Sequence, residues 1–491
     1  MINNLRKYKH FAYVGLFTGV FLTFTSCVPT LAEKSVNKEV PENFHNSDSL
    51  QEKKNNSEDS LTAAKTNWKD FFKDPNLVAL IETALQNNQE LNIILQQLQI
   101  AKNEIKARKG EYLPSVSLQA GGGIEKAGKY TRDGAVEENL DIKEGKAFPE
   151  PLPDFKAGLH AQWEVDIWSK LHNAKKAAVM NYLASVEGRN FMVTNLIAEI
   201  ANSYYELLAL DNQLKITKNT IDIQNRALRI VKLQKQAARV TELAVSKFQA
   251  EVMNTKSLQY KIKQQITETE NELNFLVGRY PQPITRSSDS FPNLIPKQLY
   301  TGLPSQLLEN RPDIRRAEYE VAESKLNIKV AKARFYPSLG ISANIGYQAF
   351  NSKYLLDTPE SLIYSVAGDL MAPLVNRNAI KAAYKSANSR QIQAVFDYEQ
   401  TVLKAYIEVA NQVSKIENLN KSYDLKSGEV DALNKSITIS NRLFKNARAE
   451  YMEVLMTQRD ALDSKFELVE TKKEQLIAVV NMYQALGGGW Q

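Results

Sequence analysis

The 491-residue sequence has little of several residue types on which common folds and sites depend. One cysteine excludes an intrachain disulfide framework, and four scattered histidines exclude a dense metal site. The mean hydropathy of −0.38 argues against a bundle of apolar helices, each of which would need about 20 consecutive apolar residues. It does not argue against a membrane β-barrel, in which only alternate strand residues face lipid.

The first residues read as a targeting signal, with residues 1–26 as a lipoprotein signal peptide. Basic residues precede an apolar stretch from Phe11 to Phe24, which is too short to span a membrane comfortably. The run Phe24-Thr25-Ser26-Cys27 resembles a bacterial lipobox, so Cys27 is the predicted site of lipid attachment. A plain signal peptide or a short anchor is the alternative. Val28 follows the cysteine, which by the same resemblance suggests the outer membrane.

The net charge depends on that signal. Removing residues 1–26 removes three basic residues and no acidic ones, so the formal charge falls from +6 to +3. No run of Lys and Arg stands out along the rest of the chain. The composition therefore gives no electrostatic footprint of a nucleic-acid partner.

The remaining sequence contains one pattern twice. A helical stretch ends at Tyr112-Leu113-Pro114-Ser115 and again at Phe335-Tyr336-Pro337-Ser338, and later landmarks recur in the same order after roughly 200–225 residues. Proline stops each helix and favours a strand after it. We predict a polar, flexible lipidated tether over 27–65, two related repeats over 66–279 and 305–491, and a proline-rich linker over 280–304.

Each repeat has two segments in which apolar and polar residues alternate. The predicted strands cover about 113–124, 154–166, 337–348 and 361–374. A half-buried soluble sheet is the alternative from periodicity alone. The outer-membrane signal and the Lys, His, Gln, Glu and Asp residues on one face favour a barrel with a wet lumen.

Four strands cannot close a barrel, and lipid does not tolerate an open sheet edge. Copies of the chain must therefore complete it. Two copies give eight strands, whose interior is filled by side chains, whereas three give 12 strands and leave a channel. The arithmetic predicts a homotrimer.

The other long segments are predicted helical hairpins, about 169–278 and about 377–486. Their long arms contain no proline and reach on the order of 100 Å at the helical rise. Apolar residues recur at seven-residue spacing in the second arms, as in Leu455, Leu462 and Val469. This spacing indicates coiled-coil packing between neighbouring helices. These stripes are core positions and not a cofactor site.

The sequence contains none of the common catalytic signatures that we sought. It has no G-x-S-x-G, H-E-x-x-H or phosphate-binding loop motif. His160 and His172 have no cysteine partner. We therefore expect no enzyme activity, no cofactor and no metal centre.

Taken in order, the landmarks resemble the TolC-type outer membrane factors, in particular the lipoprotein branch that serves resistance-nodulation-division efflux pumps. The similarity covers about residues 66–491. The matching stretches are Phe71-Phe72-Lys73-Asp74-Pro75, Trp163-Glu164-Val165-Asp166-Ile167-Trp168, Arg311-Pro312-Asp313-Ile314 and Leu486-Gly487-Gly488-Gly489-Trp490.

The resemblance implies a mainly α fold with β. Long coiled-coil helices form a periplasmic α-barrel, and four strands contribute to a trimeric 12-stranded outer-membrane β-barrel. It also implies a passive duct for drugs or other small compounds, docked to a periplasmic adaptor (membrane fusion protein) and an inner-membrane pump, with outer-membrane lipid around the barrel. A type I secretion duct and a non-channel tethering lipoprotein are the alternatives.

The resemblance also places the hairpin tips at Ala238 and Ala447, where family members usually carry glycine. The gate candidates near the tips are Glu453, Met456, Arg448 and Arg239. In a trimer, three copies of Glu453 would repel each other and favour cations at the mouth. The alternative is that Glu453 merely pairs with Arg448 or Lys445 on a solvated helix surface.

Overall fold

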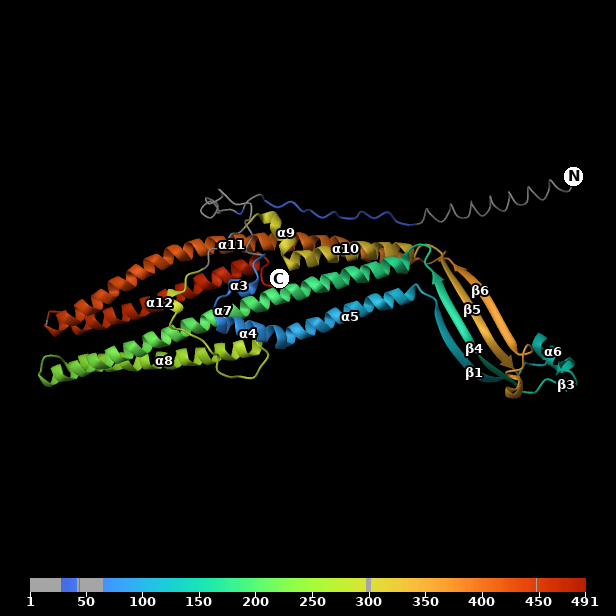
Figure 1. Ribbon diagram of the computed structural model, residues 1–491, viewed down its shortest axis with the longest axis horizontal. Coiled ribbons are helices and arrows are strands. Elements are labelled where there is room, and N and C mark those ends of the chain that lie inside the picture. The colour runs from blue at the N-terminus through green and yellow to red at the C-terminus, as the bar shows by residue number, and fades with distance from the viewer. Residues whose placement is uncertain (1–27, 42–43, 45–64, 297–301, 376, 447) are drawn as a thin grey trace. The chain divides into compact units, whose positions relative to one another are not determined.

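The computed structural model describes residues 28–41, 44, 65–296, 302–375, 377–446 and 448–491. The chain divides into two compact units, whose elements are labelled in Figure 1. The first unit contains residues 1–35, 99–183 and 319–396, and the second contains 36–98, 184–318 and 397–491. Each unit therefore combines segments from both halves of the sequence.

The first unit contains a four-stranded antiparallel sheet in the order β1-β4-β5-β6. The strands are β1 (Ser115–Glu125), β4 (Leu152–Val165), β5 (Ser338–Ala349) and β6 (Leu362–Met371). Their ends differ from the predicted ranges by at most three residues. Apolar and polar residues alternate along these strands because successive side chains point to opposite faces and one face of the sheet is apolar.

The strand register places apolar residues opposite apolar residues. One row across the sheet consists of Leu118, Leu159, Ile345 and Tyr364. The next row on the opposite face consists of Ser117, His160, Asn344 and Ser365. A slip of one residue in any strand would exchange these faces, so the pattern fixes the register.

Two glycines bring the central strands close together on the polar face. Gly158 lies opposite Gly346, and a Cβ atom on Gly158 would lie 2.6 Å from the carbonyl oxygen of Ile345. Any larger residue would force the strands apart, so glycine is required at this crossing.

The β1–β4 connection carries ordered structure of its own. It contains α6 (Arg132–Asn139) and a short hairpin of β2 (Asp141–Lys143) and β3 (Lys146–Ala147). The ammonium of Lys143 lies 4.5 Å from the ring centroid of Tyr354, which belongs to the β5–β6 connection and to the 3₁₀ turn η5 (Ser352–Tyr354). A cation–π contact therefore joins the two connections.

Long helices make up most of the rest, and they form two helical hairpins (Figure 1). The hairpins are α7 (Lys170–Gln236) with α8 (Glu242–Leu276), and α11 (Asn378–Lys445) with α12 (Tyr451–Ala485). The other helices are α3 (Trp68–Phe71), α4 (Pro75–Asn87), α5 (Gln89–Glu111), α9 (Leu307–Asn310) and α10 (Pro312–Ala333), with 3₁₀ turns η3 (Phe291–Asn293) and η4 (Pro304–Gln306). Within the described ranges, no helix is both long enough and apolar enough to cross a membrane. Long helices with a four-stranded sheet match the predicted fold class.

The second unit is held by a large apolar core. The core joins α3 and α4 to the middle of α7 and to the ends of α8 and α12. Phe71 stacks on Tyr483 with ring centroids 4.1 Å apart, and the buried Tyr204 donates a hydrogen bond to Asp74 at 2.8 Å. The short helices therefore pack against the middle of α7 and the C-terminal ends of α8 and α12.

Candidate functional site

The end of the first hairpin is a tight turn around Ala238. The N–H of Ala238 donates to the carbonyl of Lys235, and the N–H of Arg239 donates to that of Gln234, both at 2.9 Å. This pair of bonds is a Schellman motif, which requires a left-handed residue after the helix. Ala238 has φ of 52°, so an alanine occupies a position that favours glycine.

The second hairpin ends with a related hydrogen bond. The N–H of Arg448 donates to the carbonyl of Leu443 at 2.9 Å, while Ala447 lies outside the described residues. Helix α12 then begins at Tyr451, and the N–H of Glu450 donates to the carboxylate of Glu453 at 3.3 Å. Glu453 thus caps the N-terminus of its own helix, where a negative charge is favourable.

An apolar cluster joins the two hairpin ends. Its buried members come from both hairpins and are Val231, Ala244, Val245, Phe248, Val454 and Leu455. Phe248 and Val454 are each 1% exposed. Phe444, near the C-terminal end of α11, packs against this cluster. Apolar contacts therefore hold the ends together in this chain.

The gate candidates lie around this cluster and outside it. Arg239, Arg448 and Glu453 are exposed, and Met456 is 59% exposed. The structure places all four at the hairpin ends that the cluster joins. The seven-residue spacing marks Leu455 as a core position, but it does not show that Leu455 joins residues of the other hairpin, because contacts between hairpins leave no local periodic signal.

A polar network crosses the sheet of the first unit. The Nδ1 of His160 lies 2.6 Å from the Oδ1 of Asn344, and the Nδ2 of Asn344 donates to Ser365 at 3.1 Å. The hydroxyl of Ser117 donates to the carbonyl of His160 at 3.3 Å. These bonds form a hydrogen-bonded polar row on the face opposite the apolar row. In the part of the chain that is described, no three His, Cys, Asp or Glu residues gather as a metal site.

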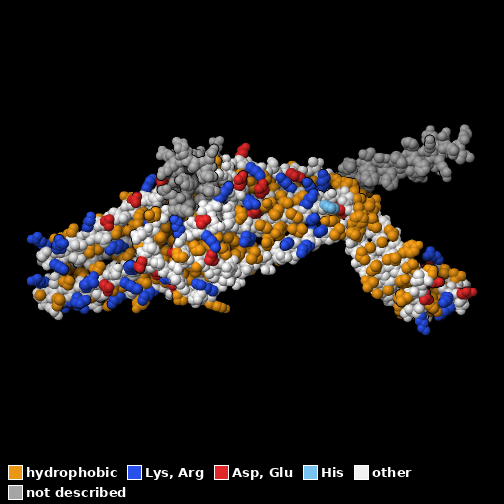
Figure 2. Space-filling view, in the orientation of Figure 1, with side chains coloured by type: hydrophobic (Ala, Val, Ile, Leu, Met, Phe, Trp, Pro, Cys, Tyr) orange, Lys and Arg blue, Asp and Glu red, His pale blue; other side chains and the backbone are white. Residues whose placement is uncertain are grey.

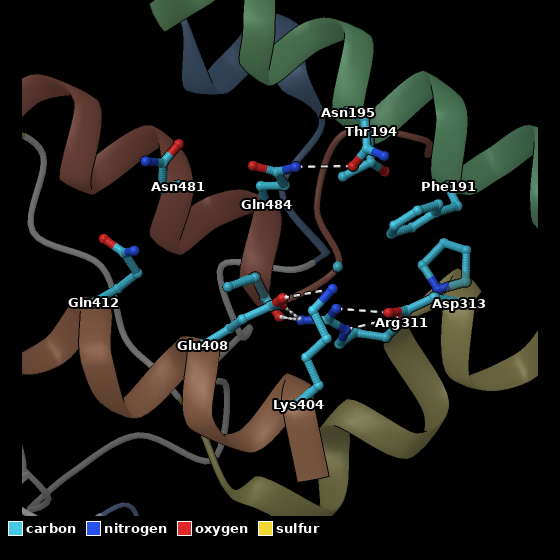
Figure 3. Close-up of a pocket in the computed structure, with 13 residues that line it drawn as sticks. Phe191, Thr194, Asn195, Arg311, Asp313, Lys404, Glu408, Gln412, Asn481 and Gln484 are labelled. Carbon is cyan, nitrogen blue, oxygen red and sulfur yellow. Dashed lines mark hydrogen bonds and ion pairs between the residues drawn. The ribbon is translucent and has the colours of Figure 1, made fainter. Parts of the chain in front are cut away.

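A charged joint lies where α12 ends and α10 begins, beside a cavity of about 300 Å³ (Figure 3). The buried Arg311 donates from Nε and Nη2 to Asp313 at 3.0 and 2.6 Å, and from Nη1 to Glu408 at 2.8 Å. Its Nη1 also donates to the carbonyl of Ala485 at 2.8 Å. Burial lowers the pKa of the Arg311 guanidinium, but Asp313 and Glu408 outweigh it and leave the pKa raised. Arg311 is therefore a paired structural cation.

The same joint recurs without charge in the first repeat. The side-chain amide of Asn88 donates to the carbonyl of Leu276, at the end of α8, at 2.9 Å. A left-handed glycine follows each helix, Gly278 with φ of 76° and Gly487 with φ of 89°. A Cβ atom on either would lie within 2.6 Å of a backbone oxygen. The C-terminal end of α8 thus contacts the start of α5 in the same way as the C-terminal end of α12 contacts the start of α10.

The N-terminal segment after the expected lipid site is packed against α10 and α11 of the first unit. Val28 and Leu31 contact an apolar cluster that includes Phe335 and Tyr384. The backbone of Lys34 exchanges two hydrogen bonds with the side chain of Gln391, at 3.1 and 2.7 Å. Cys27 itself lies outside the described residues. Specific contacts therefore hold residues 28–34, which belong to the segment 27–65 that the sequence predicts to be a flexible tether.

Comparison with known proteins gives one consistent set of similarities. The family model described as "Outer membrane efflux protein" matches residues 80–279 and 303–488. The chain is 27% identical over 424 residues to the pyoverdine export outer membrane protein OpmQ of Pseudomonas aeruginosa, covering 86% of this chain and 87% of that protein. It is 26% identical over 427 residues to the cation efflux system protein CusC of Escherichia coli, covering 86% and 88%. The structure matches the open state of the Neisseria gonorrhoeae MtrE outer membrane channel with a TM-score of 0.80 at 22% identity, covering 95% of this chain and 99% of that one.

Proposed function

The chain belongs to the outer membrane efflux protein family, and from that premise we propose that three copies of it assemble into an export duct that works with a periplasmic adaptor and an inner-membrane pump. The chain is an outer-membrane channel component whose body extends into the periplasm. Family members form trimeric channels that work with adaptors and pumps of the resistance-nodulation-division class. The family consists of channel proteins rather than enzymes, and we propose no catalytic role for this chain.

The proposed assembly of three copies rests on the two edge strands of the sheet. The outer strands β1 and β6 are exposed along their whole length, and each has one neighbour in the sheet. Unpaired strand edges cannot remain in contact with hydrocarbon, so each edge must pair with another copy. Three copies supply the 12 strands that leave a lumen, and the polar face with His160 and Asn344 suits that lumen.

The decisive measurement is the subunit number and the single-channel conductance of the full-length protein purified in detergent. We expect three subunits and discrete conductance steps in a planar bilayer. A monomer that shows no conductance would overturn the proposal.

The anchor is proposed to be an acyl group on Cys27. Cys27 directly precedes Val28 in the sequence. Val28 packs near Phe335, only three residues before β5 begins, which supports a lipid at the membrane-facing end of the helices. Mass spectrometry should find an acylated N-terminal peptide in the native protein and none in Cys27→Ser. An unmodified native peptide would contradict the anchor.

The hairpin ends are proposed as the periplasmic entrance, with tips at Ala238 and Ala447. Glu453, Met456, Arg448 and Arg239 are the proposed gate residues, because they are the charged and apolar side chains that surround the joined ends. The name of OpmQ states pyoverdine export and the name of CusC states cation efflux, each for that protein. For this chain we propose only that small compounds delivered by a pump pass through the duct.

A further inference from the structure

The hairpin ends carry a concentration of positive charge that the linear sequence hides. Within 12 residues of Ala238 and of Ala447, residues 226–250 and 435–459 hold 11 Lys and Arg but only three Asp and Glu. The net excess of eight in these two windows exceeds the formal charge of +6 of the entire chain. The rest of the chain is therefore slightly acidic, and the ends alone make it basic.

All 11 basic side chains are exposed. They are Arg226, Arg229, Lys232, Lys235, Arg239, Lys247, Lys435, Arg442, Lys445, Arg448 and Arg459. Figure 2 shows Lys and Arg gathered over the ends of α7, α8, α11 and α12. An exposed charge keeps its field in the surrounding water, so these residues act on any solute that approaches the ends.

Few of these cations are neutralised within the chain. Lys235 pairs with Glu242, and Arg459 lies 4.0 Å from Asp463. Among the described residues, the other nine cations form no ion pair. Glu453 is already bound to the N–H of Glu450, and it is outnumbered by the neighbouring Arg and Lys residues. The local field at the ends is therefore set by the cations.

The fold forces these like charges together. The apolar cluster that joins Val245 and Phe248 to Val454 and Leu455 packs one basic hairpin end against the other. Their mutual repulsion is overcome by the burial of these side chains, since each fully buried aliphatic or aromatic side chain contributes about 1.5–3 kcal/mol. A trimer multiplies the excess by three around one narrow opening.

We infer that the periplasmic entrance of the duct favours anions, so that solutes carrying carboxylate, phosphate or other negative groups enter preferentially. The inference rests on the proposed function. A ring of Arg and Lys at a narrow opening raises the local concentration of anions and repels cations. The wall of a helical tunnel is about 10 Å thick, roughly one Debye length at 0.1 M salt, so charges on either side of the wall contribute.

The test is the reversal potential of the purified full-length protein in a planar bilayer under a potassium chloride gradient. We expect a chloride-to-potassium permeability ratio above one at 0.1 M salt, and a loss of this preference near 1 M, where the Debye length falls to about 3 Å. Replacing Arg239, Lys445 and Arg448 with Gln should lower the ratio about twofold or more.

A matched control removes charge elsewhere. Lys325→Gln with Lys329→Gln changes exposed lysines of α10, and the ratio should stay at the native value. Glu453→Gln should raise the anion preference slightly. Cation preference in the native protein, or an equal effect of the tip and control variants, would overturn the inference and leave the duct intact. The absence of any conductance would instead overturn the proposed function together with this inference.

Discussion

The guanidinium of Arg311 and the backbone carbonyl of Ala485 are joined by a hydrogen bond of 2.8 Å across 174 residues of sequence. Ala485 is the last residue of α12, so a cation meets the negative end of that helix. Asn88 and Leu276 make the equivalent bond at the end of α8. The two repeats thus make equivalent contacts, one with a charged side chain and one with a neutral side chain. Each contact connects the C-terminal end of one helix to the start of a neighbouring helix.

Replacing Arg311 with Lys should destabilise the second unit. The ammonium keeps the charge but cannot make the paired bonds to Asp313 while also reaching Glu408 and the Ala485 carbonyl. A buried polar group that loses its hydrogen-bond partner costs about 1–3 kcal/mol, and we expect a loss of about 2 kcal/mol in the unfolding free energy measured with urea in detergent.

A surface ion pair provides the control for that experiment. Lys215 and Asp289 are 65% and 85% exposed, so Lys215→Gln should change the unfolding free energy by less than about 1 kcal/mol. Equal losses in the Arg311 and Lys215 variants would show that the joint has no special role.

Ala238→Gly should stabilise the protein. Ala238 holds a left-handed conformation, and glycine relieves a strain of about 1 kcal/mol at such a position. The neighbouring substitution Ala237→Gly should lower stability, because Ala237 has no positive φ and glycine only adds freedom to the unfolded chain. Urea unfolding of both variants decides the matter; a loss of stability in Ala238→Gly would contradict the assigned turn.

Phe248→Ala should loosen the two hairpin ends. The side chain is 1% exposed within the apolar cluster, and its truncation should cost about 3–5 kcal/mol. Hydrogen exchange should accelerate at the N-terminal ends of both α8 and α12, where the cluster lies. Phe275, near the C-terminal end of α8, is 69% exposed, so Phe275→Ala should leave exchange at the N-terminal ends unchanged. Faster exchange confined to α8 would show that the cluster does not couple the hairpins.

Adjacent residues of β1 should respond oppositely to lysine. Leu118 belongs to the apolar face and Ser117 to the polar face. A lysine on a lipid-facing strand costs about 2–4 kcal/mol at the bilayer midplane, whereas the lumen tolerates it. Leu118→Lys should therefore lower the yield of trimer assembled in vesicles, and Ser117→Lys should not. The reverse result would exchange the assigned faces.

The strands, the long hairpins and the repeated pattern can be predicted from the sequence alone. These depend on local periodicity: alternation places Leu118 and Ser117 on opposite faces, and the spacing of Leu455 and Leu462 marks a helix seam. Arg311 was visible as part of a motif, but its partners could not be read. Glu408 and Ala485 lie 97 and 174 residues away and share no periodic signal with it.

Tertiary packing, which the sequence does not reveal, determines which charged side chains lie close together and which residues contact the N-terminal segment. The Lys and Arg residues of each hairpin are spread along the sequence, so that neither hairpin shows a cluster of basic residues. The apolar cluster that contains Phe248 and Val454 brings the two hairpin ends, and with them these basic residues, close together. Val28 similarly packs against a cluster whose members, Phe335 among them, lie far away in the sequence. Local sequence preferences determine the helices and strands, whereas burial of residues far apart in the sequence determines which of these elements pack together. The charge around the hairpin ends depends on that packing.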